Sequence, residues 1–368
     1  MSTNPIPPVP HGPKSSLEGQ TLASGWKLVE RLSKPPGATG GNFGVGYRAV
    51  RGNEIAFVKA IDFVAALSAE DPITELRNLT SIATFEKEVL EYCTSRRMSR
   101  VLRYFGHEYI SWDGSGSPMS RVSCLIMESG TEDLRCLFNG NGPNTCAWNL
   151  HVMADAAAAI AQLHRAGIAH QDIKPSNVIK VPEQRVPGRR ELMKVGDLGR
   201  VVRKDQTGPF DTAHWPGDVQ YSPPERWYGF VPPDWVDSRE ASDAYMLGSL
   251  LVFLFTGMTL QALLEISIPP QFRPDNWAGA FDDALLMSVL VDAHARVLHD
   301  HLLPDLTPEL ADGIIEIARN LTHPDPRKRG DVRARGELGR PVGIERLQHR
   351  LMLLATRAAS IDRGRRQK

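Results

Sequence analysis

The string HQDIKPSN, residues 170–177, restricts the fold of this chain more than any other feature of its sequence. Asp172 supplies a carboxylate that can orient an attacking hydroxyl and accept its proton. Lys174 adds a cation where negative charge develops on a transferred phosphoryl group, and Asn177 adds a neutral oxygen ligand for Mg²⁺. An Ala-rich apolar segment, 150–166, precedes the string and is typical of a buried helix. The pattern predicts a phosphoryl-transfer loop between a helix and a strand.

Two further motifs carry groups that the same chemistry needs. The string DLG at 197–199 follows a short apolar strand, and the carboxylate of Asp197 is a hard ligand suited to Mg²⁺. Lys59 lies in the apolar strand IAFVKAI, 55–61, where a lysine can hold the α- and β-phosphates of a nucleotide. Groups for metal, phosphate and proton therefore occur together in one chain.

With these motifs in this order, the chain resembles the eukaryotic-like protein kinase family from about Trp26 to Asp331, and residues 174–177 resemble its Ser/Thr branch. The resemblance implies an α+β, bilobal kinase-like fold with a small β-rich N-lobe and a larger helical C-lobe. It implies a Mg-ATP-dependent kinase that transfers the γ-phosphate to Ser/Thr hydroxyls of protein substrates, with ATP and Mg²⁺ as cofactors. Its catalytic residues would be Asp172, Lys174 and Lys59, and its metal ligands Asn177 and Asp197.

The helix expected at 80–93 should offer a glutamate to pair with Lys59. Two candidates lie in the string FEKEVL, Glu86 and Glu88. The spacing from Phe85 favours Glu88, whereas the Val-Leu pair that follows favours Glu86. We predict that Glu88 is the catalytic partner of Lys59.

The nucleotide-binding residues follow from the resemblance. The Gly-rich run at 40–47 resembles the loop that covers the phosphates, and the string LIMESG at 125–130 resembles the connection that binds adenine. Thr39 stands where the family has its first glycine, and Gly46 stands where a valine covers the adenine. The residues expected to contact nucleotide are Lys59, Gly40, Gly41, Gly44, Met127, Glu128 and Gly130, with Met127 as the gatekeeper.

Four residues are expected to have structural roles in the C-lobe. The string SPPE at 222–225 resembles the end of the family's activation segment, and Glu225 is expected to pair with Arg329. Asp243, near a helix start, is expected to tie back to the catalytic loop, and it can also cap its own helix. His170 is expected to support the loop from a buried position.

Two residues of this region depart from the family pattern. Gln171 replaces an arginine that pairs with a phosphate on the activation segment, which predicts activity that such phosphorylation does not gate. Asp218 replaces a threonine that bonds the catalytic Asp and Lys. Its carboxylate can form an ion pair with Lys174, but it would repel Asp172.

The remaining expectations concern organisation and location. The formal net charge is +0, so the chain has no general attraction to nucleic acid. No apolar run reaches the ~20 residues of a membrane span and no signal peptide is visible, so we expect a cytoplasmic protein without a membrane span. We expect a disordered Pro-rich tail at 1–24, an N-lobe at 25–130, a C-lobe at 131–335, and a C-terminal helix with a basic tail at 336–368.

Two other functions share this pattern. A pseudokinase or nucleotide-binding regulatory module is favoured by the departures at Thr39, Gly46 and Asp218. Such modules commonly lose one of the four groups that the chemistry requires. This chain keeps all four, which are Lys59, Asp172, Asn177 and Asp197. A small-molecule kinase of similar fold would generally lack the Pro-Pro-Glu string and its arginine partner. The expected partners are therefore ATP and a protein substrate that the sequence does not identify.

Overall fold

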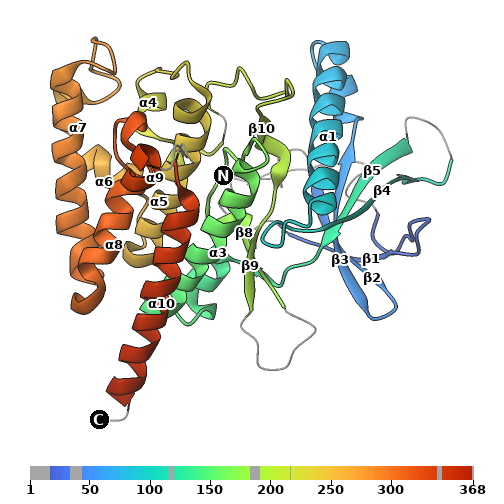
Figure 1. The fold of residues 1–368 in the computed structure, drawn as a ribbon. Helices are drawn as coiled ribbons and strands as arrows, with labels where there is room; N and C mark the ends of the chain where they lie inside the picture. The colour runs from blue at the N-terminus through green and yellow to red at the C-terminus, as the bar shows by residue number, and fades with distance from the viewer. Residues whose placement is uncertain are drawn as a thin grey trace, which may run out of the picture. The chain divides into compact units, whose positions relative to one another are not determined.

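The computed structural model describes residues 17–33, 44–115, 120–182, 191–215, 217–337 and 342–366. The chain divides into two compact units. The first comprises the residues up to Arg96 together with Leu102–Ser129, and the second comprises Arg97–Val101 together with the residues from Gly130 onward. The first unit is built on a sheet and the second is mainly helical, which confirms the predicted α+β class (Figure 1).

The first unit contains a five-stranded antiparallel sheet in the order β1-β2-β3-β5-β4. Side chains alternate across it, so Ala56, Val58 and Ala60 lie on one face of β3 while Lys59 lies on the other. The register places Lys59 opposite Gly46 on one side and Leu125 on the other. The strands are β1 (Lys27–Arg31), β2 (Val45–Arg51), β3 (Glu54–Asp62), β4 (Tyr104–Ser111) and β5 (Arg121–Glu128).

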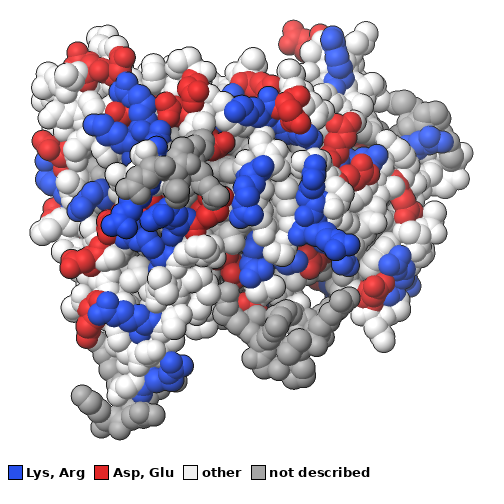
Figure 2. Space-filling view, in the orientation of Figure 1, with Lys and Arg blue, Asp and Glu red and all other residues white. Residues whose placement is uncertain are grey.

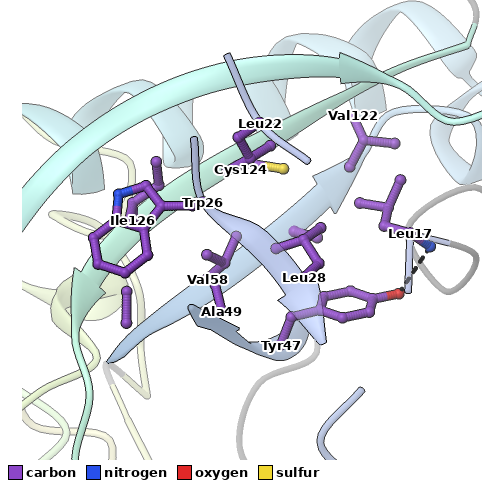
Figure 3. Packing of buried hydrophobic residues seen from close by; sticks show 12 residues of the cluster. Leu17, Leu22, Trp26, Leu28, Tyr47, Ala49, Val58, Val122, Cys124 and Ile126 are labelled. Carbon is purple, nitrogen blue, oxygen red and sulfur yellow. Dashed lines mark hydrogen bonds between the residues drawn. The ribbon is translucent and has the colours of Figure 1, made fainter. Parts of the chain in front are cut away.

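The segment before β1 covers the sheet face that carries Ala56 and Val58. Leu17, Leu22 and Trp26 are at most 3% exposed and pack into the apolar cluster of Figure 3. The Leu17 N–H donates to the Tyr47 hydroxyl at 3.3 Å. This covered face is the core of the unit, and it leaves the opposite face for Lys59.

The prediction of a disordered tail through residue 24 is therefore wrong for residues 17–24. Leu17 and Leu22 are apolar side chains that gain free energy by burial against the sheet, and they order the segment between them. Residues 1–16, which hold the prolines of the predicted tail, lie outside the described residues.

Helix α1 (Pro72–Ser95) begins earlier than the sequence pattern indicates and lies beside the sheet (Figure 1). The Asp71 side chain caps its first turn by accepting the Thr74 N–H at 3.1 Å, and a proline at the first helical position suits that start. Its buried residues recur at helical spacing: Phe85, Glu86, Val89, Leu90 and Cys93. The carboxylate on that buried face is Glu86.

In the second unit, a small sheet in the order β6-β8-β9 and a two-stranded pair, β7 with β10, carry the motif loops. The catalytic string lies between β7 (Ile168–Ala169) and β8 (Val178–Val181), and DLG follows β9 (Leu192–Val195). The other two strands are β6 (Glu132–Asp133) and β10 (Val202–Arg203).

Helices form the rest of the second unit. Helix α5 is buried on nearly all sides, as the apolar run in its sequence requires. Helix α10 packs along α3 (Figure 1), with Leu347, Leu351 and Ala355 fully buried. The helices are α2 (Leu134–Cys136), α3 (Cys146–His164), α4 (Pro224–Trp227), α5 (Ala241–Thr256), α6 (Leu260–Ser267), α7 (Ala284–Val297), α8 (Pro308–Leu321), α9 (Val332–Glu337) and α10 (Ile344–Arg366).

Neither surface charge nor hydropathy indicates a particular class of binding partner. Acidic and basic side chains are intermingled over the face shown in Figure 2. Within the described residues, no single helix has the length and apolar character needed to cross a membrane. One pair of helical segments, Val236–Thr256 and Leu260–Ser267, meets that test together by length and composition, with an 87° bend between them.

Candidate active site

Lys59 forms a bidentate ion pair with Glu86 in the first unit. Its Nζ lies 2.8 Å from Oε1 and 2.9 Å from Oε2 of Glu86. The Lys59 side chain is 11% exposed and the Glu86 side chain 2%. Removing one partner of so buried a pair would leave an uncompensated charge, so each residue fixes the other. The pair can therefore hold a lysine ammonium in place for the phosphates of a nucleotide.

The prediction that Glu88 is the partner of Lys59 is wrong. Glu88 is exposed, whereas Glu86 shares the buried face of α1 with Val89 and Leu90. Residues three and four positions apart lie on one helix face, so the apolar pair after Glu86 marks it as the inward carboxylate. The Val-Leu spacing indicates the inward carboxylate correctly, whereas the spacing from Phe85 does not.

The predicted nucleotide residues of the first unit fall into two groups. Gly40 and Gly41 lie outside the described residues. At Gly44 a Cβ would come within 3.0 Å of the Ala60 carbonyl oxygen, so a side chain is disfavoured there. Met127 is 5% exposed, near the end of strand β5, which has a neighbouring strand on each side.

The backbone around the predicted adenine connection is also constrained. The Glu128 N–H donates to the Arg103 carbonyl at 2.8 Å, so of the two backbone groups of Glu128 the carbonyl is the candidate for an adenine. Gly130 belongs to the second unit, and a Cβ there would overlap the Ile179 side chain of the same unit. Glycine is required at that position by packing.

Gly46 is paired with a large neighbour. A Cβ at Gly46 would lie 2.7 Å from Cε2 of Phe57, its diagonal neighbour on β3, two residues before its register partner Lys59. Phe57 occupies the position of the small residue in the family's Val-Ala-Ile-Lys string, and Gly46 the position of its valine. The two departures from the family pattern compensate each other in volume.

Residues of the catalytic string, 170–177, bond one another around the side chain of Asp172. Lys174 Nζ lies 3.1 Å from Asp172 Oδ2, and Asn177 Nδ2 donates to the same Oδ2 at 3.1 Å and to the Asp172 carbonyl at 2.7 Å. All three residues are 5% exposed. The carboxylate is thus oriented by a cation and an amide, which is the arrangement a proton acceptor in phosphoryl transfer needs.

His170 supports this loop from a buried position, as predicted. Its Nδ1 accepts the Asp172 N–H at 3.2 Å, so the ring proton is on Nε2, which contacts the Gly196 carbonyl at 3.1 Å. The imidazole therefore links the catalytic loop to the residue before Asp197.

Asp243 anchors the same loop from helix α5. Its Oδ2 accepts the His170 N–H at 2.7 Å and its Oδ1 accepts the Gln171 N–H at 2.8 Å. His164 Nε2 lies 2.9 Å from Oδ2. Burial acts to raise the pKa of Asp243, but the hydrogen bond and charge of His164 outweigh it and the pKa is lowered. The predicted tie to the loop is confirmed; the alternative of a helix cap is not used, because both oxygens face the loop.

Asn177 and Asp197 fit the requirements of a Mg²⁺ site. Asn177 Nδ2 faces Asp172, and its Oδ1, on the other side of the amide group, accepts the Ser176 hydroxyl at 3.2 Å. The Gly196 N–H donates to the Asn177 carbonyl at 2.9 Å, which holds the two ligand residues on adjoining backbone. Both offer hard oxygens, and Mg²⁺ in such sites completes its shell with phosphate oxygens and water. No group of three or more His, Cys, Asp or Glu able to hold a metal occurs among the described residues.

Asp218 meets the catalytic string from the activation segment. Its Oδ2 lies 3.5 Å from Lys174 Nζ, which confirms the predicted ion pair, and its backbone N–H donates to Asp172 Oδ1 at 3.0 Å. Its Oδ1 accepts the Gln220 N–H at 3.1 Å. Lys174 therefore stands between two carboxylates and offsets their mutual repulsion.

The predicted pair of Glu225 and Arg329 is confirmed. Arg329 donates to the two carboxylate oxygens at 2.7 and 2.5 Å, and both side chains are 0% exposed. Arg329 also lies over the Tyr245 ring, 4.9 Å from its centroid. The pair ties the end of the activation segment to the loop after α8.

Comparison with known families identifies the family of this chain. A model of the protein kinase domain matches residues 40–330 of the chain. The chain belongs to the protein kinase family. It is similar to the serine/threonine-protein kinase PknB of Mycobacterium tuberculosis, with 28% identity over 268 residues that cover 62% of this chain and 41% of that protein.

Two further relatives give the same picture. PknB of Mycobacterium leprae is 29% identical over 250 residues, covering 64% of this chain and 36% of that protein. The serine/threonine-protein kinase PknA of Mycobacterium tuberculosis is 28% identical over 143 residues, covering 39% of this chain and 30% of that protein. The kinase chain spans at most about two fifths of the length of these curated relatives.

Two residues near the kinase's catalytic loop were missed from the sequence. His164 ends α3 and bonds Asp243, and Arg239 precedes α5 and bonds the side chain of Gln171. A histidine at a helix end and an arginine in a polar stretch have ordinary surface interpretations. Only the fold shows that both are buried against the loop.

Proposed function

We propose that this kinase transfers the γ-phosphate of ATP to Ser or Thr hydroxyls of a protein substrate. The observation that carries the proposal is the closed arrangement of Asp172, Lys174 and Asn177, in which an oriented carboxylate stands beside a cation. Family membership and the names of the similar serine/threonine-protein kinases support it.

Each of these groups has a distinct task in the proposed reaction. Asp172 Oδ2 is held by Asn177 and Lys174, which aligns it to orient the substrate hydroxyl. It takes the hydroxyl proton as the new O–P bond forms and the bond from the γ-phosphorus to the departing ADP breaks. Lys174 stabilises negative charge on the transferred group. The Lys59 ammonium, fixed by Glu86, binds phosphate oxygens of the nucleotide.

Mg²⁺, when bound, would neutralise charge on the β- and γ-phosphates. Asn177 Oδ1 and the Asp197 carboxylate are the residues that would hold it. The hydrogen bond from Asn177 Nδ2 to Asp172 means that the residue that would bind metal also orients the proposed base, so the two tasks are coupled. A cytoplasmic location, and the absence of a nucleic-acid partner, stay predictions.

The test is phosphate transfer from γ-labelled ATP with Mg²⁺ to a mixture of candidate proteins. Wild type should label protein, Asp172→Ala should not, and Asp305→Ala, which changes an exposed carboxylate, should behave as wild type. Mass spectrometry of the products should place the phosphate on Ser or Thr.

The competing functions give different outcomes. ATP binding without transfer to any acceptor would indicate a pseudokinase, and transfer confined to small hydroxyl compounds would indicate a small-molecule kinase. The departure at Asp218 favours the first of these, because its carboxylate shares the charge of Lys174.

A further inference from the structure

A buried pair of polar side chains, Gln171 and Arg239, lies behind the catalytic loop. Gln171 is 0% exposed and Arg239 is 8% exposed. Gln171 Nε2 donates to the Arg239 carbonyl at 2.9 Å, and Arg239 Nη1 donates to Gln171 Oε1 at 3.3 Å. The two residues thus bond each other in both directions, side chain to backbone and side chain to side chain.

The other arm of the guanidinium reaches the activation segment, residues 197–225. Arg239 Nη2 donates to the backbone carbonyl of Asp211. That carbonyl belongs to a tight turn in which the Gly208 N–H donates to Asp211 Oδ2 at 3.0 Å and the Ala213 N–H donates to the Phe210 carbonyl at 3.1 Å. One buried cation therefore joins the catalytic loop to the middle of the activation segment.

The loop side of this connection is rigid. Gln171 has φ 62°, a left-handed conformation that costs a non-glycine residue free energy and persists only where surrounding contacts enforce it. Asp243 enforces it by accepting both the Gln171 N–H and, at 3.0 Å, its Nε2–H. Arg239 therefore bonds a residue, Gln171, whose conformation is held in place by Asp243.

The activation segment touches the same loop a second time, farther along. A Cβ at Gly217 would overlap the Gln171 carbonyl oxygen, and the Asp218 N–H bonds Asp172. The segment is thus held to the catalytic loop at Asp211 through Arg239 and at Gly217–Asp218 directly.

The charges explain why residue 171 is neutral in this chain. An arginine at 171 would place a second cation beside the buried guanidinium of Arg239, whereas the amide of Gln171 offers it an acceptor. Burial lowers the pKa of Arg239, and the charges of Asp211 and Asp243 act in the opposite direction. In the family pattern an arginine at 171 pairs with a phosphate on the activation segment. Here the cation is Arg239, just before α5, and it bonds a backbone carbonyl of that segment.

We propose that Arg239 is a positioning residue, a built-in clamp that orders the activation segment against the catalytic loop without a phosphate on that segment. The inference rests on the proposed kinase function for its effect on turnover, but the clamp itself is a property of the fold. Arginine is required because its planar fork reaches two acceptors at once, which the single ammonium of a lysine cannot reproduce.

The test uses the full chain and two readouts. Hydrogen exchange is followed at the turn amides of residues 208–213, in the Asp172→Ala background so that no autophosphorylation occurs. Arg239→Met should make these amides exchange roughly 10-fold to 100-fold faster, as expected for loss of a hydrogen bond to a charged group. Arg165→Met, which removes an exposed guanidinium paired with Glu345, is the matched control and should leave the turn unchanged.

Turnover is then measured with Asp172 intact on phosphatase-treated protein. Wild type should keep its activity after treatment. Arg239→Met should lose roughly 10-fold or more in kcat with little change in KM for ATP, since the clamp acts on the catalytic loop and not on nucleotide affinity. If Arg239→Met does not fold, Arg239→Lys, which keeps the charge, and Gln171→Met, which removes only the side-chain acceptor and donor, should show the same directions.

Two results would overturn the clamp. One is wild-type exchange at residues 208–213 in the folded Arg239 and Gln171 variants. The other is loss of wild-type activity on phosphatase treatment. A wild-type chain that transfers no phosphate under any condition, yet shows the exchange change, would refute the proposed kinase function and leave the clamp standing.

Discussion

Glu225 and Arg329 lie 104 positions apart in the sequence and form an ion pair in which neither side chain has any exposed surface. An ion pair so placed is strong when intact and very unfavourable when one partner is removed, because the remaining charge is left in a medium that cannot solvate it.

Arg329→Met should therefore lower the free energy of unfolding by about 3–5 kcal/mol, as for other broken buried pairs. Urea denaturation followed by circular dichroism measures this. Arg350→Met removes a partly exposed arginine that pairs with Glu316, and it should cost at most about 1 kcal/mol. Equal losses in the two variants would show that burial does not govern the Glu225 pair.

Glu86→Gln and Glu88→Gln make the same chemical change on neighbouring positions of α1. Glu86→Gln removes the charge that fixes Lys59 and should lower kcat/KM for ATP by on the order of 10²-fold, as misplacement of a phosphate ligand does. Glu88→Gln alters an exposed residue and should change it little. Steady-state kinetics at varied ATP settles the comparison, and a larger effect at Glu88 would contradict the assignment.

Gly46 and Phe57 should behave as a coupled pair in nucleotide binding. Gly46→Val places side-chain atoms in the space of the Phe57 ring, and overpacking of this kind costs about 1–3 kcal/mol. Gly46→Val should weaken ATP binding, and Phe57→Ala combined with it should restore much of the loss. Calorimetric titration of the single and double variants measures the coupling; strictly additive effects would refute it.

His294 gives stability a defined pH dependence. It is buried in α7 with Nε2 2.7 Å from Thr322 Oγ1. Burial first, then the charges of His323, Arg319 and Arg329, lowers its pKa to about 3. A histidine whose folded pKa lies below the unfolded ~6.5 binds protons only on unfolding, so its contribution is complete above pH ~6.5 and is lost as the pH falls toward the folded pKa.

The stability difference between wild type and His294→Gln should therefore shrink by up to about 1.4 kcal/mol per pH unit below pH ~6. Denaturation at several pH values between 7 and 4 tests this, with the exposed His299→Gln as the control. A constant difference between wild type and His294→Gln across that range would contradict a neutral buried imidazole.

The sequence was sufficient for the parts of the site that depend on order along the chain. Asp172, Lys174 and Asn177 lie within one short string, so their proximity follows from local backbone alone. Pairing of Glu225 with Arg329 was also predictable, because each lies in a motif of its own. Fold class followed from the same motifs.

The features that could not be predicted depend on which face of a helix is buried and on contacts between residues far apart in the sequence. The choice between Glu86 and Glu88 is a choice of helix face, and it is decided by which side of α1 meets the sheet. Arg239 lies in a polar stretch that has no pattern, and its burial arises because α5 starts behind the catalytic loop. Leu17 and Leu22 stand beside a Pro-rich run whose composition hid their anchoring role.

Helix α10 follows the region that matches the kinase domain, yet Leu347, Leu351 and Ala355 are interior residues that cover α3. The unit that folds and the unit that relatives share therefore have different C-terminal boundaries in this chain. A recombinant fragment cut at residue 330 would keep every motif residue and still expose the apolar side of the helix that leads into the catalytic loop. For this protein, a stable recombinant fragment should therefore include α10, which lies beyond the residues that identify the kinase domain.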